Sequence, residues 1–204
     1  MMACSHQPYS EQAITPIRTS ESLANIWDYN YRFFISHPTP EHFSVCHDLS
    51  CNTVSQVSLS KNEWQQITQS LSEKAATSAE EREQIKTAIS RFEVIVGQHI
   101  GTEHDLAENK LSTNRFGQMD CVDEATNTTV YLRLIEQAGL LRWHKTASRT
   151  SRGVLSAQAP HNTATIIDKK NDIRYAVDSW FFANGEKPNI VELSRWKSGW
   201  SPDH

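Results

Sequence analysis

Hydrophobic residues recur at helical spacing in two adjacent segments of the chain. Ser60 and Glu63 have the spacing of a capping box, which marks a helix start, and Ser78 and Glu81 repeat it. The apolar positions that follow, three or four residues apart, are Trp64, Ile67 and Leu71 in the first segment and Ile85, Ile89, Phe92, Val96 and His99 in the second. The pattern predicts an antiparallel pair of helices.

A third helical pattern begins at Cys121. Asp120 precedes it as the expected N-cap, and Gly139 follows it as a good C-terminal stop. The positions that would face the core are Val122, Ala125, Thr129, Leu132, Ile135 and Ala138. Residues 102–119 have no periodicity, so they predict a long loop leading directly to Cys121, and loops of this length are usually functional or mobile.

Strand patterns lie mostly after this helix. The segments concerned are an irregular strand within 43–59 that follows the Cys46/Cys51 loop, a strand over 140–145, a hairpin of 161–167 with 173–182, and a last strand or helix over 190–196. Residues 147–159, rich in Ser, Thr and Arg, predict a loop. Two helices followed by one helix packed on an antiparallel sheet indicate an α+β fold.

The chain length of 204 residues suits one compact domain. Residues 1–22 are polar with two prolines and predict a tether. Residues 23–204 then form a single domain, with a helical N-terminal part over 23–101 and a catalytic core over 102–204. A hydrophobic fraction of 38% is enough to bury a core.

Charge excludes several classes of partner. The formal net charge is −4 and basic residues are dispersed, which argues against nucleic acid or an anionic membrane surface as the partner. No stretch approaches the roughly 18 apolar residues of a transmembrane helix.

Four cysteines divide into distinct settings. Cys46 and Cys51 could close a small disulfide loop, remain reduced, or bind zinc together with His47 and a further ligand. Cys4 stands where a lipoprotein carries its lipid, although the basic and apolar leader regions do not precede it. These features favour a periplasmic or lipid-anchored protein, with a cytoplasmic one as the alternative.

Cys121 is the strongest candidate for chemistry. A thiol attacks as thiolate, and a helix N-terminus favours the ionised form. Pro160-His161 opens one strand of the predicted hairpin, and Asp178 lies on the other. The carboxylates of Asp120, Asp123 and Glu124 lie near the thiol and would oppose its ionisation.

The hairpin geometry can place histidine and aspartate together. With a four-residue loop over 169–172, His161 faces Trp180 and Asp178 lies one diagonal away on the same face, within reach of a bond from imidazole Nδ1–H. An odd loop would put Asp178 on the opposite face. In this arrangement His161 is general base and then acid, and Asp178 orients it.

The oxyanion of an acyl-transfer reaction also needs donors. The backbone N–H of Cys121 is one candidate, and the side chain of Gln118, three residues earlier, is a second. The alternative for Gln118 is that it simply bonds the loop. Four tryptophans late in the chain favour core packing or, alternatively, an aromatic-lined cleft: Trp143, Trp180, Trp196 and Trp200.

The chain resembles the transglutaminase-like, or papain-like, cysteine peptidase superfamily. The resemblance rests on Gly139-Leu140-Leu141-Arg142 after the Cys121 helix, then a histidine strand, then the segment 175–180 around Asp178. It implies a Cys-bearing helix on an antiparallel sheet and a Cys121–His161–Asp178 triad. In that superfamily a tryptophan often follows the histidine, whereas Asn162 follows it here, so the wall of the acyl pocket differs.

A closer resemblance is to a bacterial family with the pattern GQMDC, PH and VDSW, found here at 117–121, 160–161 and 177–180. Many of its members have lipoprotein-type leaders, and the likeness covers roughly residues 40–200. The expected reaction is therefore acyl transfer at an amide bond, most simply hydrolysis of a peptide or amide, without a cofactor or metal. The alternatives are a non-catalytic interaction module of the cell envelope and a metal-binding sensor.

Overall fold

The computed structural model describes residues 34–109, 116–153 and 160–202. Its elements, in chain order, are β1 (Phe43–His47), β2 (Thr53–Val57), α1 (Lys61–Thr68), the 3-10 helix η3 (Gln69–Leu71), α2 (Ser78–Ile100), α3 (Cys121–Gln137), β3 (His144–Arg152), β4 (His161–Asp168), β5 (Arg174–Asp178), β6 (Asn189–Glu192) and α4 (Leu193–Lys197). The α+β class is confirmed. The predicted tether and Cys4 lie outside the described residues.

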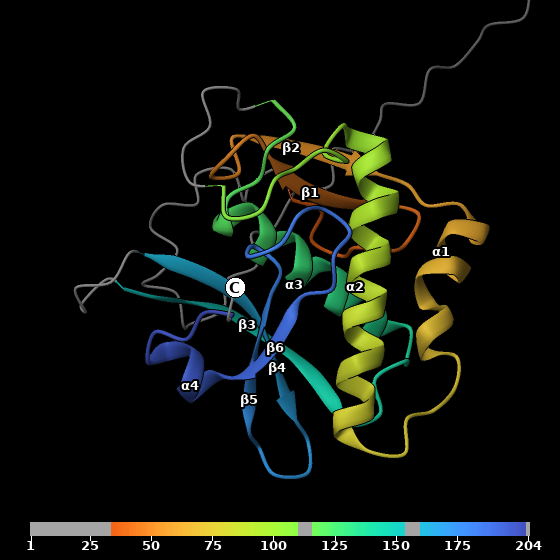
Figure 1. Ribbon diagram of the computed structural model, residues 1–204. Helices are drawn as coiled ribbons and strands as arrows, with labels where there is room; N and C mark the ends of the chain where they lie inside the picture. Colours follow the sequence, from red (N-terminus) through yellow and green to blue (C-terminus); the bar gives the residue numbers. More distant parts are fainter. Residues whose placement is uncertain (1–33, 110–115, 154–159, 203–204) are drawn as a thin grey trace, which may run out of the picture.

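Helix α3 is enclosed between two sheets (Figure 1). The antiparallel sheet β3-β4-β5-β6 packs on one side of it, and strand β1 of the β1-β2 hairpin packs on another. All residues from Asp123 to Leu132 are therefore buried. A polar contact ties the layers together, because the side chain of Asn127 bonds both the N–H and the carbonyl of Cys46, at 2.7 and 2.8 Å.

Helices α1 and α2 form the predicted antiparallel pair (Figure 1). The capping box at Ser60 is confirmed. The start of α2 differs by one residue from the prediction, since Thr77 is the N-cap and accepts from Glu80 N at 3.1 Å. Ser78 is already the first helical residue. The reason lies in Glu81, which turns inward and binds the backbone before β3 instead of capping its own helix.

One strand prediction was incomplete and another was wrong. The strand predicted after the Cys46/Cys51 loop is present as β2, and it pairs with β1, a strand before that loop that was not predicted. Strand β3 runs over 144–152, into the segment predicted as loop, and does not begin at Leu140. It is an edge strand that pairs only with β4, and its Ser, Thr and Arg side chains are mostly half-buried. Such polar composition resembles a loop but suits an edge.

The register of the predicted β4–β5 hairpin is confirmed. Ala164 pairs with Val177, and Asp168 N donates to Ile173 O at 2.9 Å, which closes the loop over 169–172. The even loop length places residues 161 and 178 on the same face of the sheet. The candidate histidine and aspartate thus meet because of four loop residues.

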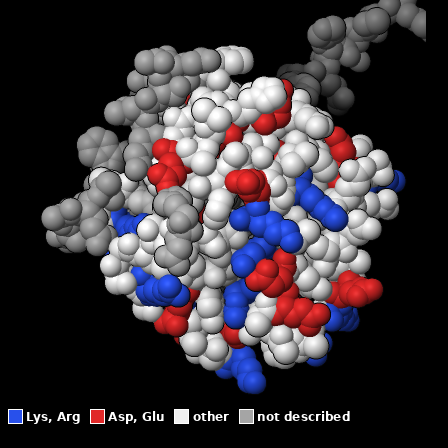
Figure 2. All heavy atoms as spheres, viewed as in Figure 1, with Lys and Arg blue, Asp and Glu red and all other residues white. Residues whose placement is uncertain are grey.

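The surface carries charges of both signs. On the face drawn in Figure 2, Lys and Arg side chains are interspersed with Asp and Glu, without a broad basic area. No helix in the described ranges combines the length and apolar character needed to cross a bilayer.

Candidate functional site

The start of α3 has the predicted cap. Asp120 Oδ1 accepts from Val122 N at 2.9 Å and from Asp123 N at 3.2 Å, and Asp123 Oδ2 accepts from Asp120 N at 3.1 Å. Cys121 is the first helical residue, and its free thiol is half-buried. The N–H of Cys121 donates to no described residue, as expected of an amide in the first helical turn.

His161 and Asp178 form a buried pair. Imidazole Nε2 lies 2.7 Å from Asp178 Oδ2. The expected bond through Nδ1 was wrong, since the ring is turned so that Nε2 meets the carboxylate. Nδ1 is buried and has no hydrogen-bond partner among the described residues. Burial lowers the pKa of His161, but the Asp178 carboxylate and the nearby Cys121 sulfur outweigh it and raise the pKa to about 9.

Asp178 has a second partner that the sequence did not reveal. Nε1 of Trp196, a fully buried residue of α4, donates to the same Oδ2 at 2.6 Å. A buried tryptophan needs an acceptor for its N–H, which is the only signal that could have suggested this contact. The sequence pattern left the partner open because α4 lies 18 residues further along the chain.

Aromatic rings enclose His161. Its ring centroid lies 4.7 Å from that of Trp180, 5.2 Å from that of Phe181 and 5.4 Å from that of Trp196. Trp180 and Trp196 are buried, which fits core packing and not an open aromatic cleft. The rings keep water away from the His161–Asp178 bond, and an electrostatic contact is stronger in such a setting.

Asn162 contacts the thiol directly. Its Nδ2 donates to Cys121 Sγ at 3.6 Å, from the position next to His161 on β4. Strand β4 therefore brings both an imidazole and a carboxamide to the start of α3. The sequence showed Asn162 only as a departure from the superfamily pattern.

Gln118 holds the loop before α3. Its Oε1 accepts from Asn109 Nδ2 at 2.5 Å and from Leu106 N at 3.3 Å, and its Nε2 donates to the carbonyl of His104 at 3.1 Å. These contacts match the alternative role, which was to bond the loop. Its role as an oxyanion donor stays a prediction.

A glycine contact closes the base of the same loop. Gly117 has a φ of +70° and lies against the carbonyl of Gly101, so a Cβ atom at Gly117 would collide with that oxygen. The described residues between α2 and α3 form no helix or strand, as predicted.

The carboxylates near Cys121 are less of an obstacle than the sequence suggested. Burial, followed by the charge of Asp120, raises the pKa of Asp123 well above its ordinary value. Burial likewise raises the pKa of Glu124 to about 8, and Ser179 Oγ donates to it at 2.6 Å. Glu124 is therefore mostly uncharged near neutral pH, and the raised pKa of Asp123 acts in the same direction.

A disulfide joins Cys46 and Cys51. The four residues 48–51 all have left-handed backbone angles, with φ between 55° and 67°. None of them is glycine, so each conformation costs about 1 kcal/mol or more and needs outside support.

Residues of the disulfide loop form hydrogen bonds with the chain on both sides of Cys121. Asp48 Oδ1 accepts from Gly117 N at 2.9 Å, and Ser50 Oγ donates to Asp120 Oδ2 at 2.8 Å. Cys51 N donates to Asp123 Oδ1 at 2.6 Å. The loop thus holds the chain on both sides of the thiol.

Removing the disulfide is expected to weaken these hydrogen bonds and to lower the stability of the fold. The Cys46→Ala/Cys51→Ala double variant should lose about 2 kcal/mol of unfolding free energy, the loop entropy of a six-residue ring. Urea denaturation of the oxidised wild type and the variant measures the difference. A phosphine reductant should destabilise the wild type and leave the double variant unchanged. Equal stability of the two oxidised proteins would refute the expectation.

The side chains considered as zinc ligands make other bonds in this structure. His47 Nε2 bonds Ser55 Oγ at 2.9 Å, and its Nδ1 lies 3.1 Å from Asp48 Oδ2. Among the described residues, the group with ligand spacing is Cys46, Cys51 and Asp123. Its two sulfurs are joined to each other, so they cannot act as thiolate ligands.

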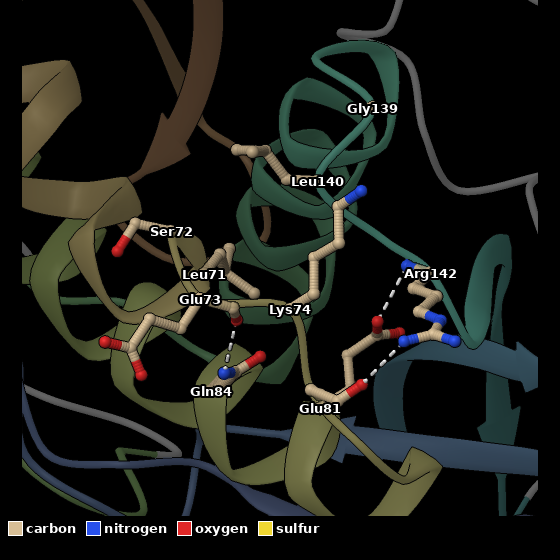
Figure 3. A pocket seen from close by; sticks show the side chains of 10 residues that line it. Leu71, Ser72, Glu73, Lys74, Glu81, Gln84, Gly139, Leu140 and Arg142 are labelled. Atoms are coloured by element: carbon tan, nitrogen blue, oxygen red, sulfur yellow. Dashed lines mark hydrogen bonds between the residues drawn. The ribbon is translucent and has the colours of Figure 1, made fainter.

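A pocket of about 520 Å³ lies away from this site (Figure 3). Its lining comes from η3, the segment after it, α2 and the segment between α3 and β3: Leu71, Ser72, Glu73, Lys74, Ala75, Glu81, Gln84, Gly139, Leu140 and Arg142. Glu81 is not available to a ligand there, because its carboxylate is occupied by backbone N–H groups including that of Arg142.

Three of the four predicted residues therefore gather at one place. Cys121 lies at the start of α3, beside His161, whose ring bonds Asp178. A thiol in this setting can pass its proton to imidazole and attack a carbonyl carbon. No family model, curated protein or solved structure matches the chain.

Proposed function

We propose that the protein is a cysteine-dependent hydrolase of amide bonds, a peptidase or amidase on a transglutaminase-like core. The observation that carries the proposal is the 2.7 Å bond between His161 Nε2 and Asp178, in an imidazole that the Cys121 sulfur also approaches. The raised pKa of His161, about 9, favours an imidazolium beside a thiolate.

The residues then act in a defined order. Cys121 Sγ attacks the carbonyl carbon of the substrate, and the negative charge moves to the carbonyl oxygen. His161, protonated at Nδ1, gives its proton to the leaving amine, and Asp178 holds the ring in place. Water then cleaves the thioester with His161 as base, which restores the thiol and releases the acid.

A location outside the cytoplasm would restrict the class of substrate. The Cys46–Cys51 disulfide is compatible with a location outside the cytoplasm. The proposed substrate is a peptide or amide of the cell envelope, and a lipid on Cys4 would anchor the enzyme there. Hydrolysis is preferred to transamidation because no amine-acceptor site is apparent in the sequence.

Alkylation of Cys121 by iodoacetamide tests the proposal. A free thiol has a pKa of about 8.5, so at pH 6 less than about 1% is ionised. We expect wild-type Cys121 to react at pH 6 about 30- to 100-fold faster than Cys121 in His161→Ala. Peptide mass spectrometry reads the modification at Cys121 alone.

His99→Ala is the matched control. His99 also pairs with a carboxylate, since its Nε2 lies 2.7 Å from Glu63 Oε1, but it lies on α2 and outside the site. This variant should react like the wild type. If His161→Ala also reacts like the wild type, the enzyme proposal fails and a non-catalytic interaction module becomes the better account.

A further inference from the structure

We infer that Asn162 is a catalytic residue, the side-chain donor that stabilises the oxyanion together with the N–H of Cys121. The inference rests on the proposed function and assigns a role that the sequence prediction gave to Gln118. It follows from the placement of two carboxamides near one thiol.

The first observation is the contact itself. Asn162 Nδ2 donates to Cys121 Sγ at 3.6 Å. In a tetrahedral intermediate the oxyanion is two bonds from the sulfur, so a donor already directed at Sγ needs only a small rotation to reach it. Asn162 is half-buried, whereas its neighbour His161 is buried.

The second observation is that Gln118 is committed elsewhere. Its Nε2 donates to His104 O, and its Oε1 accepts from Leu106 N and Asn109 Nδ2. Moving this amide toward the thiol would break three hydrogen bonds that hold the loop before α3. Asn162 has no such commitment, because among the described residues the hydrogen bond of its side chain is the one to Cys121.

The third observation is rigidity. Asn162 lies between His161 and Thr163 on β4 and pairs with Ser151 of β3. A donor on a strand is held more precisely than one on a loop, and oxyanion stabilisation depends on donors fixed before the charge develops. The Cys121 N–H, at the start of α3, supplies a second fixed donor.

The chemistry separates this role from thiol activation. In alkylation Sγ attacks the methylene carbon of iodoacetamide and iodide leaves to solvent, so no oxyanion forms. p-Nitrophenyl acetate is attacked at its carbonyl carbon, the C=O electron pair moves onto oxygen, and collapse releases p-nitrophenolate and leaves an acetyl thioester. A donor to the oxyanion therefore changes acylation much more than alkylation.

The experiment compares the two reactions in wild type, Asn162→Ala, Asn162→Asp and Gln118→Ala. We expect acylation of Asn162→Ala to fall about 100-fold, the usual cost of losing one oxyanion donor, while its maximal alkylation rate changes less than about threefold. Asn162→Asp keeps the shape without the N–H and should lose acylation too. Gln118→Ala should change acylation no more than alkylation, because it removes no donor to the oxyanion.

Each outcome supports or refutes the role of Asn162 as the oxyanion donor. Normal acylation in both Asn162 variants overturns the role of Asn162, and loss of acylation only in Gln118→Ala assigns the donor to Gln118 instead. Equal loss of both reactions in the Asn162 variants makes Asn162 a residue that activates the thiol and refutes the oxyanion role. If wild-type alkylation does not depend on His161, the proposed function itself has failed, which is a separate result.

Discussion

Replacing Glu81 with alanine is expected to lower the free energy of unfolding by about 3–5 kcal/mol. Glu81 is 1% exposed. It accepts from Arg142 N at 2.7 Å, from Trp143 N at 3.0 Å and from His144 N and Nδ1 at 2.8 and 2.9 Å. Truncation leaves these donors without their acceptor in the interior, and each buried donor left unsatisfied costs about 1–3 kcal/mol.

Urea denaturation at pH 7 measures the loss. Glu83→Ala is the control, because Glu83 lies on the same helix, is exposed and pairs only with Lys86 at the surface. Its effect should stay within about 0.5 kcal/mol. A loss below about 1 kcal/mol in Glu81→Ala would show that water or a rearranged backbone replaces the carboxylate.

The same carboxylate predicts a weaker fold in acid. Burial raises the pKa of Glu81, but hydrogen bonds from His144 and from the backbone N–H groups of Trp143 and Arg142 outweigh it and lower the pKa below 4.5. The ionised form therefore stabilises the fold above the unfolded pKa. That stabilisation is lost as the pH falls through the folded pKa.

Alkaline pH is expected to weaken the fold through Glu93 and Glu124. Both are buried, and burial raises the pKa of Glu124 to about 8 and that of Glu93 well above its ordinary value. The unfolded chain releases these protons near 4.5, whereas the folded chain retains them. Stability therefore falls as the pH rises above about 4.5, and the contribution of Glu124 to this fall ends near pH 8.

Unfolding free energies at pH 6, 7, 8 and 9 test this slope. Glu124→Gln has no proton to lose and can still accept from Ser179, so its stability should depend less on pH between 6 and 8. Glu83→Gln, an exposed change on α2, should keep the wild-type slope. A Glu124→Gln slope equal to that of the wild type would mean that Glu124 is ionised in the folded protein.

Short sequence patterns predicted the elements that depend on residues close together in the chain. The capping box at Ser60, the start of α3 after Asp120 and the even loop over 169–172 depend on residues a few positions apart, and the structure contains all three. The α2 start was wrong because Thr77 and Ser78 are both good caps. A distant contact favours Thr77 as the cap. Glu81 accepts a hydrogen bond from the backbone N–H of His144, so it does not complete a capping box with Ser78.

The contacts that complete the candidate site are long-range. Trp196 reaches Asp178 from α4, and Asn162 reaches Cys121 across 41 residues of sequence. No periodicity or spacing encodes either contact. The sequence also did not predict which ring nitrogen of His161 meets the Asp178 carboxylate. The orientation with Nε2 toward the carboxylate occurs together with packing of the ring against Trp180 and Trp196, which residue spacing does not encode.

The contact of Gly117 with Gly101 joins the end of α2 to the approach to α3. The described residues just after Gly101 add further ties, because Asp105 Oδ1 accepts from Met119 N at 2.7 Å and the carbonyl of His104 accepts from Gln118 Nε2 at 3.1 Å. A side chain at Gly117 would therefore act on Cys121 from a distance, because it would push the approach to α3 away from the end of α2.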